Sequence, residues 1–276
     1  MRRITPTGLK VLKALAVYRF LTVVQFQRLG VSSDATHIRD TLRPLSRGRA
    51  SPLGAIDLGV LPTMGRLPKV YYLTSHGAEI LQELEGWELS KIQFARSKAI
   101  SQKDFLHRLG CVDFHIKARE FARHNKQKMN FFHSYFDYAG KGVGMKAKTT
   151  LYIGKERATP DGVFQLSSGD ASRLFVFEFS RGMDTKRVLA QMALLCVGIE
   201  THRFQDVYKY PFKPRIVWVF DTPNGLEAIK RRASNIGAIE RQADAVFLKT
   251  VDSLASDFLG GWQSITGEEK ALFPLL

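Results

Sequence analysis

Residues 158–182, ATPDGVFQLSSGDASRLFVFEFSRG, restrict the fold of this chain more than any other stretch. Two apolar runs flank a polar turn that contains glycine, and this pattern predicts two strands of a hairpin. Asp161 stands near the start of the first strand, and Glu178 lies inside the apolar run of the second. A charge in such a strand is costly unless it is paired or binds a metal. The stretch therefore predicts either a metal-dependent active site or a hairpin that carries two structural carboxylates.

Length and composition indicate a globular protein. The chain has 276 residues, of which 45% are hydrophobic, enough for one large domain or two smaller ones. Its two cysteines, Cys111 and Cys196, have no Cys-x-x-Cys spacing, which argues against a zinc ribbon and a disulfide framework. Lys13 and Arg19 interrupt the apolar N-terminal stretch, and no later segment reaches the length of a membrane span. We therefore expect a cytoplasmic protein that does not bind a membrane.

The charge of the chain is uneven. The net charge is +15, and residues 1–150 hold 25 Lys and Arg against 11 Asp and Glu, whereas residues 151–276 hold 16 against 15. A basic first half favours a polyanionic partner, and nucleic acid is the first candidate. A membrane surface is a weaker alternative, because the basic residues do not cluster beside an apolar helix.

The first ninety residues predict three short helices. The first helix begins after Thr5, an N-cap that is followed by proline. The second begins at Thr22, and the third is expected to be capped by Ser32 or Ser33. Apolar residues with a helical period indicate one buried face for each helix. Pro44 is expected to bend or end the third helix.

Two strands, at about residues 55–60 and 70–73, follow the three helices, and a further helix is expected from Ser75. Helix, helix, helix and hairpin is the order of a winged helix-turn-helix, which we assign to residues 1–88. The alternative is a small helical domain with a solvated basic face. The DNA-binding candidates on the third helix and the wing are Thr36, His37, Arg39, Arg43, Arg47, Arg66 and Lys69.

Residues 89–101 are expected to form a helical linker, and residues 102–276 a second domain. A long amphipathic helix is predicted over 102–124, and the glycine-rich basic stretch 140–150 is expected to form a flexible loop beside DNA. Strands are then predicted in NFFHSYFDY, in the 158–182 hairpin, in RIVWVF and, last, in AVFLKT, with helices between the later strands. This order predicts a mixed α/β sheet with a helix on each face.

The 158–182 stretch resembles the PD-(D/E)XK nuclease motif, since Pro160 and Asp161 are followed by Glu178 at the end of the next strand. The chain as a whole resembles the replication-relaxation family, which includes MobC-like plasmid mobilisation proteins. That family combines a winged helix with a nuclease-like domain, and its PDG…FEF-RG signature is similar to Pro160–Gly162 and Phe177–Gly182 here. KVYYLTSHG also resembles the way in which the family ends its wing.

The resemblance implies a site for Mg²⁺ or Mn²⁺, cations that prefer oxygen ligands and that promote phosphodiester hydrolysis. The implied ligands are Asp161, Glu178 and the carbonyl of Phe179, with Glu120 from the long helix as a further candidate. Ser180 replaces the lysine of the nuclease motif. The side chains that could substitute for this lysine are Arg181, Lys186 and Gln191.

The resemblance thus implies a DNA-binding protein of a plasmid or mobile element that nicks or cuts double-stranded DNA at an origin of transfer or replication. The alternative is a non-catalytic DNA-binding regulator, or an accessory or loading factor, with a degenerate nuclease fold; Ser180 favours this alternative. Other replication, transfer or transposition proteins are possible partners. A homodimer is expected if the target is palindromic.

Overall fold

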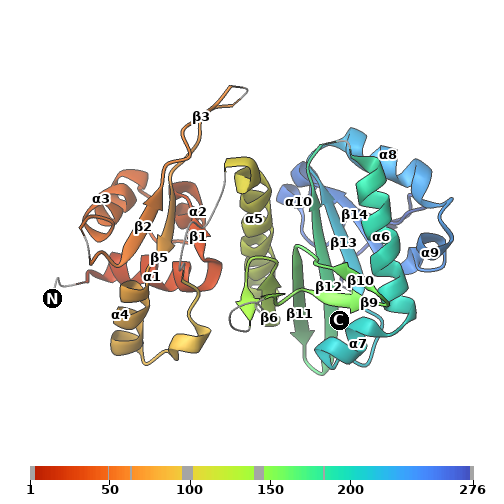
Figure 1. The fold of residues 1–276 in the computed structure, drawn as a ribbon, viewed down its shortest axis with the longest axis horizontal. Coiled ribbons are helices and arrows are strands. Elements are labelled where there is room, and N and C mark those ends of the chain that lie inside the picture. Colours follow the sequence, from red (N-terminus) through yellow and green to blue (C-terminus); the bar gives the residue numbers. More distant parts are fainter. Residues whose placement is uncertain are drawn as a thin grey trace. The chain divides into compact units, whose positions relative to one another are not determined.

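The computed structural model describes residues 4–48, 50–62, 64–94, 102–139, 146–182 and 184–273. The chain divides into two compact units, Met1–Asp113 and Phe114–Leu276 (Figure 1). The division falls within helix α5 (Gln102–His124), whose first half is grouped with the first unit. The sequence places the start of the second domain at Gln102, where this helix begins, because sequence periodicity detects the start of a helix and not the unit against which each half packs.

The first unit contains four main helices and a three-stranded antiparallel sheet. The strands lie in the order β1-β5-β2, with Phe20 opposite Tyr72 and Leu53 opposite Leu73. A second, two-stranded hairpin lies between β2 and β5 along the chain (Figure 1). The elements are α1 (Pro6–Tyr18), β1 (Phe20–Leu21), α2 (Val23–Arg28), α3 (Ala35–Leu45), β2 (Leu53–Ile56), β3 (Val60–Leu61), β4 (Gly65–Arg66), β5 (Val70–Leu73) and α4 (Ser75–Glu85).

Side-chain caps fix the starts of these helices. Thr5 accepts a hydrogen bond from the Gly8 amide, and Thr22 forms a reciprocal capping box with Gln25, both at predicted positions. The prediction of Ser32 or Ser33 as the cap of α3 is wrong. The cap is Asp34, whose carboxylate accepts from the Thr36 amide at 2.7 Å.

The first predicted strand of the first unit's hairpin differs from its prediction: β2 starts at Leu53, two residues early, and the strand is interrupted. The predicted strand over 55–60 is divided, because β2 ends at Ile56 and β3 starts at Val60. Between them the Asp57 carboxylate accepts from the Gly59 amide at 3.1 Å, and Gly59 has a φ of +75° that favours glycine. This local turn is the physical reason for the interruption.

The predicted helical linker, 89–101, is described as far as residue 94. One turn of 3₁₀ helix covers Leu89–Lys91, and Ile92 is buried. The Gln93 amide donates to the carbonyl of Ala16 in α1 at 3.0 Å, so this segment belongs to the first unit. Residues 95–101 lie outside the described part.

The second unit is built on a seven-stranded sheet in the order β16-β15-β14-β13-β12-β11-β6. Strands β12, β13 and β14 are parallel, and the other pairs are antiparallel, which confirms the predicted mixed α/β class. AVFLKT is not the last strand, because β15 and β16 follow it. The strands are β6 (Lys128–Ser134), β11 (Gly162–Ser168), β12 (Ala171–Ser180), β13 (Arg215–Phe220), β14 (Val246–Thr250), β15 (Trp262–Gln263) and β16 (Glu269–Lys270).

Helices cover both faces of this sheet. Alternate residues of β12, such as Val176, join a buried cluster with helices α6 (Thr185–Glu200) and α8 (Pro223–Ala233). Phe177 points to the other face and stacks on Phe114 of α5 at a ring distance of 3.8 Å. Shorter helices, α7 (Arg203–Tyr208), α9 (Gly237–Glu240) and α10 (Val251–Ser256), complete the unit.

Two small hairpins precede β11. The first pairs β7 (Tyr138–Ala139) with β8 (Lys146–Ala147), and the second pairs β9 (Leu151–Ile153) with β10 (Glu156–Ala158). Much of the glycine-rich stretch predicted as a loop, residues 140–145, lies outside the described residues. Among the residues described, no helix combines the length and the apolar character needed to cross a membrane.

Candidate functional site

The two carboxylates of the 158–182 stretch face each other. Gly162 of β11 lies opposite Phe177 of β12, so the next step of the antiparallel ladder places Asp161 opposite Glu178. Residues directly opposite in such a ladder have Cβ atoms about 5 Å apart. Both side chains are buried, with 8% and 7% of their surface exposed. The hairpin therefore holds two acidic groups together in a site that excludes most of the water.

Each carboxylate has a fixed hydrogen-bond partner. Asp161 Oδ2 accepts from the backbone amide of Phe179 at 2.8 Å, which holds it against the end of β12. Glu178 Oε1 accepts from Nε2 of Gln191 in α6 at 3.1 Å. Gln191, one of the predicted site residues, is thus brought to the carboxylate pair.

The pair is electrostatically strained. Burial raises the pKa of Glu178 well above its ordinary value, and the charge and hydrogen bonding of Asp161 raise it further. The Gln191 hydrogen bond and the positive charge of Arg187 act in the opposite direction. Two carboxylates so arranged bind a proton between them, or a cation that takes its place.

Arg187 is a site residue that the sequence reasoning missed. It lies four residues before Gln191, so both side chains emerge from one face of α6, and its charge acts on Glu178. Its guanidinium is exposed and also lies 3.6 Å from the Asp184 carboxylate. Arg187 lies one helical turn before Gln191, but the sequence does not show which face of α6 is turned towards Glu178.

The other predicted substitutes for the motif lysine have different surroundings. Arg181 follows β12 and Lys186 lies in the first turn of α6, and both are exposed. In the described part of the chain neither forms a hydrogen bond or an ion pair with Asp161 or Glu178. Lys186 is adjacent to Arg187, about 100° around the helix from it.

Ser180 occupies the motif position of the lysine and is buried. Its hydroxyl accepts a hydrogen bond from Nε1 of Trp218, in the neighbouring strand β13, at 2.7 Å. Ser180 shares a face of β12 with Glu178, since the two residues are separated by one position. A lysine at this position would lack the hydroxyl that accepts this hydrogen bond from the indole.

The remaining predicted metal ligands are less directly placed. Glu120 is half-buried on α5, and among the described residues it makes no hydrogen bond or ion pair with Asp161 or Glu178. The backbone of Phe179 is beside Asp161, because its amide binds that carboxylate. Its carbonyl oxygen stays a predicted ligand.

The structure explains why glycine occupies positions 162 and 182, in the PDG and FEF-RG motifs. A Cβ at Gly162 would meet ring atoms of Phe177 and Phe132 at 3.1 and 3.2 Å, so glycine lets both rings pack over the strand. Gly182 has a φ of +78°, and its amide donates to the Asp221 carboxylate at 3.2 and 3.1 Å. These contacts fix the two ends of the segment that carries the carboxylates.

A separate basic surface lies on the first unit. The residues predicted to contact DNA from α3 are all exposed. His37 Nε2 lies 3.2 Å from the Thr7 hydroxyl, and Arg43 lies 3.9 Å from the Asp40 carboxylate. The exposed set on α3 and on the turn that follows it is Thr36, His37, Arg39, Arg43 and Arg47.

The segment between β2 and β5, which contains the β3–β4 hairpin, carries two further cations. Arg66 donates to Asp57 at 2.8 Å, and Lys69 lies 3.9 Å from the same carboxylate. The Gly59 amide and the Arg66 guanidinium lower the pKa of Asp57, which keeps this residue ionised. Asp57, absent from the predicted site, therefore neutralises part of this segment's positive charge.

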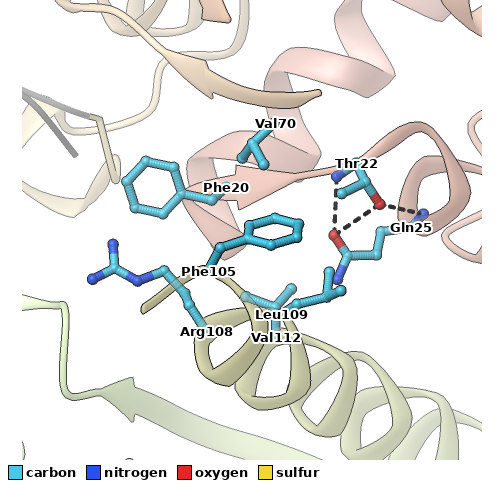
Figure 2. Close-up of a pocket in the computed structure, with 8 residues that line it drawn as sticks. All are labelled: Phe20, Thr22, Gln25, Val70, Phe105, Arg108, Leu109 and Val112. Atoms are coloured by element: carbon cyan, nitrogen blue, oxygen red, sulfur yellow. Dashed lines mark hydrogen bonds between the residues drawn. The ribbon is translucent and has the colours of Figure 1, made fainter. Parts of the chain in front are cut away.

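The first unit also contains a small cavity, shown in Figure 2. Phe20 and Val70 line one side, and Phe105 and Leu109 of α5 line the other. The polar atoms of Thr22 and Gln25 at its margin bond to each other as the capping box. The bonded atoms of the capping box are therefore already paired within the protein.

Comparison with known proteins places the chain in a family. No curated protein and no solved structure matches it. A family model described as replication-relaxation matches residues 12–193, more than half of the chain. The matched span includes α3, both carboxylates, Arg187 and Gln191. The chain belongs to the replication-relaxation family.

Proposed function

We propose that this protein binds double-stranded DNA of a plasmid or other mobile element and nicks it with Mg²⁺ or Mn²⁺. Membership of the replication-relaxation family supports the biological setting. The observation that carries the nuclease assignment is the pair of buried, facing carboxylates, Asp161 and Glu178. The mixed sheet with one carboxylate on each arm of a hairpin is consistent with a PD-(D/E)XK-like unit.

The residues present fit a hard divalent cation. Two carboxylates supply oxygen ligands, and a cation between them would replace the shared proton and remove the repulsion that raises the pKa of Glu178. Asp161, Glu178 and the Phe179 carbonyl would hold it. When bound, it would stabilise charge on the phosphate and lower the pKa of a water nucleophile.

The chain's own side chains would prepare this site. The Phe179 amide orients Asp161, and Gln191 orients Glu178, so both carboxylates are held before substrate binds. Arg187 provides a positive charge on the same face of α6 as Gln191, where it could bind the phosphate. It is our first candidate for the part that lysine plays in the motif.

The first unit would supply recognition. The order α1, α2, α3 and an antiparallel hairpin supports a winged helix-turn-helix with α3 in the major groove. Arg39, Arg43 and Arg47 are exposed for contacts with bases or phosphates, and Arg66 and Lys69 would contact phosphate from the wing. The net positive charge of the chain supports a polyanionic partner, and both units share it: residues 1–113 hold 17 Lys and Arg against 9 Asp and Glu, and residues 114–276 hold 24 against 17.

A nicking assay tests the proposal. Supercoiled plasmid that carries the element's own origin is incubated with wild-type protein, Asp161→Asn or Glu178→Gln, in Mn²⁺, Mg²⁺ or EDTA. Asp170→Asn is the matched control, because Asp170 is an exposed acid in the turn at the other end of the same hairpin. We expect metal-dependent open circles from wild type and the control, and none from the two site variants.

Ser180 favours a second candidate, an accessory or regulatory DNA-binding protein with an inactive nuclease fold. Its burial under Trp218 leaves no cation at the motif position of the lysine. Unchanged plasmid in every lane, with equal gel shifts for wild type and Asp161→Asn, would support this candidate. Mn²⁺ binding measured by electron paramagnetic resonance then shows whether the carboxylate pair still holds a metal.

A further inference from the structure

The β9–β10 hairpin of the second unit presents one buried and one exposed face. Leu151, Ile153 and Ala158 are buried in the core cluster that includes α6. Because side chains alternate along a strand, Tyr152 must point away from this core, and 47% of its surface is exposed. Arg203 of α7 donates to the Tyr152 carbonyl at 2.7 Å and helps to fix its backbone.

Two positive charges lie beside the tyrosine. Arg157 lies directly opposite Tyr152 in the antiparallel register, so both belong to the exposed face. The Lys146 ammonium lies 5.8 Å from the centre of the Tyr152 ring. Lys155 in the connecting turn is exposed, and Glu156 is the hairpin's exposed acid. Within the described part of the chain, no ion pair engages Lys146, Lys155 or Arg157.

An exposed ring among cations has the chemistry of a single-strand contact. An unpaired base can stack on an aromatic face, while neighbouring Lys and Arg side chains bind the phosphates on either side. A base in an intact duplex cannot stack in this way, because its faces are covered by its neighbours. The surface defined by Tyr152, Arg157 and Lys146 therefore fits a single strand better than a duplex.

The surface also lies close to the carboxylate pair along the chain. Strand β10 ends at Ala158, and three residues, at most about 10 Å of chain, lead from there to Asp161. The Thr150 and Thr159 hydroxyls, 3.2 Å apart, join the start of the hairpin to its end. Tyr152 lies opposite Arg157, and four residues, at most about 14 Å of chain, lead from Arg157 to Asp161, a distance that a strand of a few nucleotides spans.

We propose that the outer face of the β9–β10 hairpin binds single-stranded DNA by stacking a base on Tyr152 between Lys146 and Arg157. The inference rests on the proposed function, since it places this strand beside the site that nicks or relaxes DNA. It concerns a surface of the second unit, separate from the duplex-binding surface assigned to α3 and the wing.

The test is fluorescence anisotropy of a labelled oligo(dT) strand with the full-length protein. We expect Tyr152→Ala to weaken binding about tenfold and Tyr152→Phe, which keeps the ring, to bind as wild type. Arg157→Gln should lower the slope of log affinity against log salt concentration by about 0.7, as for the loss of one phosphate contact to a single strand. Phe212→Ala is the matched control, because Phe212 is an aromatic residue of the same unit that is 59% exposed.

Two outcomes would overturn the inference. The first is that Tyr152→Ala binds oligo(dT) as tightly as the wild-type protein or Phe212→Ala. The second is that Tyr152→Phe loses as much oligo(dT) affinity as Tyr152→Ala. Thermal unfolding of each variant establishes that it is folded. Binding of a labelled duplex is measured in parallel. If the wild-type protein binds and nicks the duplex but Tyr152→Ala does not weaken oligo(dT) binding, this surface alone is rejected. If the wild-type protein binds neither probe, the proposed function is rejected as well.

Discussion

At the scale of the residue, Glu178 makes folding depend on pH. Its pKa is raised in the folded protein by burial and then by Asp161, so the folded state binds this proton more tightly than the unfolded state. Stability therefore falls as pH rises from the ordinary pKa of a glutamate, about 4.5, towards the raised pKa of the folded protein. Glu178→Gln removes the charge and keeps a hydrogen-bond acceptor for Gln191. We expect this variant to be more stable than wild type at pH 7 and equal near pH 4.

Urea unfolding between pH 4 and pH 8 measures this difference. Asp170→Asn is again the control, since this turn residue is exposed and its substitution should not alter the pH profile. A gap between wild type and Glu178→Gln that is the same at every pH would mean that a change in packing or hydrogen bonding, and not ionisation, explains it.

A divalent cation offers a second test of the same residues. A ligand that binds the folded state alone raises stability in proportion to the logarithm of its concentration above the dissociation constant. Mn²⁺ is therefore expected to raise the melting temperature of the wild-type protein and to have no effect on Asp161→Asn. Equal shifts for both proteins would place the bound metal elsewhere.

At the scale of the element, the face of β12 that contacts α5 depends on aromatic packing. Phe114 of α5 stacks on Phe177 with an angle of 7° between the rings, and it also contacts Phe164 and Phe258. Truncation of a fully buried phenylalanine typically costs about 3–5 kcal/mol. We expect Phe114→Ala to lose about this much in urea unfolding of the full chain, and Phe114→Leu distinctly less. Similar values for both variants would mean that the volume kept by leucine contributes little and that the ring stacking is what stabilises this face.

Asp57 makes a prediction of opposite sign, because its carboxylate neutralises two cations of the first unit that are proposed to contact phosphate. Asp57→Asn would release Arg66 and Lys69 and raise the charge of the segment between β2 and β5 by one. If this segment is the wing, affinity for duplex DNA should rise, and the salt slope should steepen by up to about one. Anisotropy with a duplex at several salt concentrations measures both. Weaker binding would instead show that Asp57 positions Arg66 for its contact.

Elements with a strong local signal could be predicted from the sequence. Helix α5 begins and ends at the expected residues, 102 and 124, and Thr5 and Thr22 cap their helices as expected. The strands β1, β15 and β16 were missed, because two residues cannot show an alternating pattern. Their pairing depends on partners that are distant in the sequence.

Only the part of the candidate site that depends on neighbouring residues in the sequence could be predicted. The spacing of Asp161 and Glu178 in two adjacent strands is local, so a hairpin brings them together. Arg187 and Gln191 act on Glu178 from helix α6. Whether these two residues or Lys186 lie near Glu178 depends on how α6 is rotated about its axis against the sheet. Sequence periodicity predicts the buried face of α6, marked by Val188 and Met192, but not which flanking polar residues lie above the end of β12.

At the scale of the whole molecule, the residues proposed for duplex recognition and the carboxylate pair belong to different units. The proposed duplex contacts, Arg43 and Arg47, are in the first unit, and the carboxylate pair is in the second. Arg43→Gln and Arg47→Gln should therefore each weaken duplex binding and lower the salt slope by about one, while Mn²⁺ binding at Asp161 and Glu178 is unchanged. Asp161→Asn should have the reverse effect: duplex affinity is kept and nicking is lost.

The matched control for this pair of tests is Arg231→Gln, an exposed arginine of α8 that lies in the second unit. It removes the same charge from the chain, so an equal loss of duplex affinity in Arg231→Gln and Arg43→Gln would indicate attraction by net charge and not a specific surface. A larger loss for Arg43→Gln and Arg47→Gln would locate the duplex on α3 and the turn after it. Loss of Mn²⁺ binding in an α3 variant would contradict the division, because those side chains belong to the first unit and the carboxylate ligands to the second.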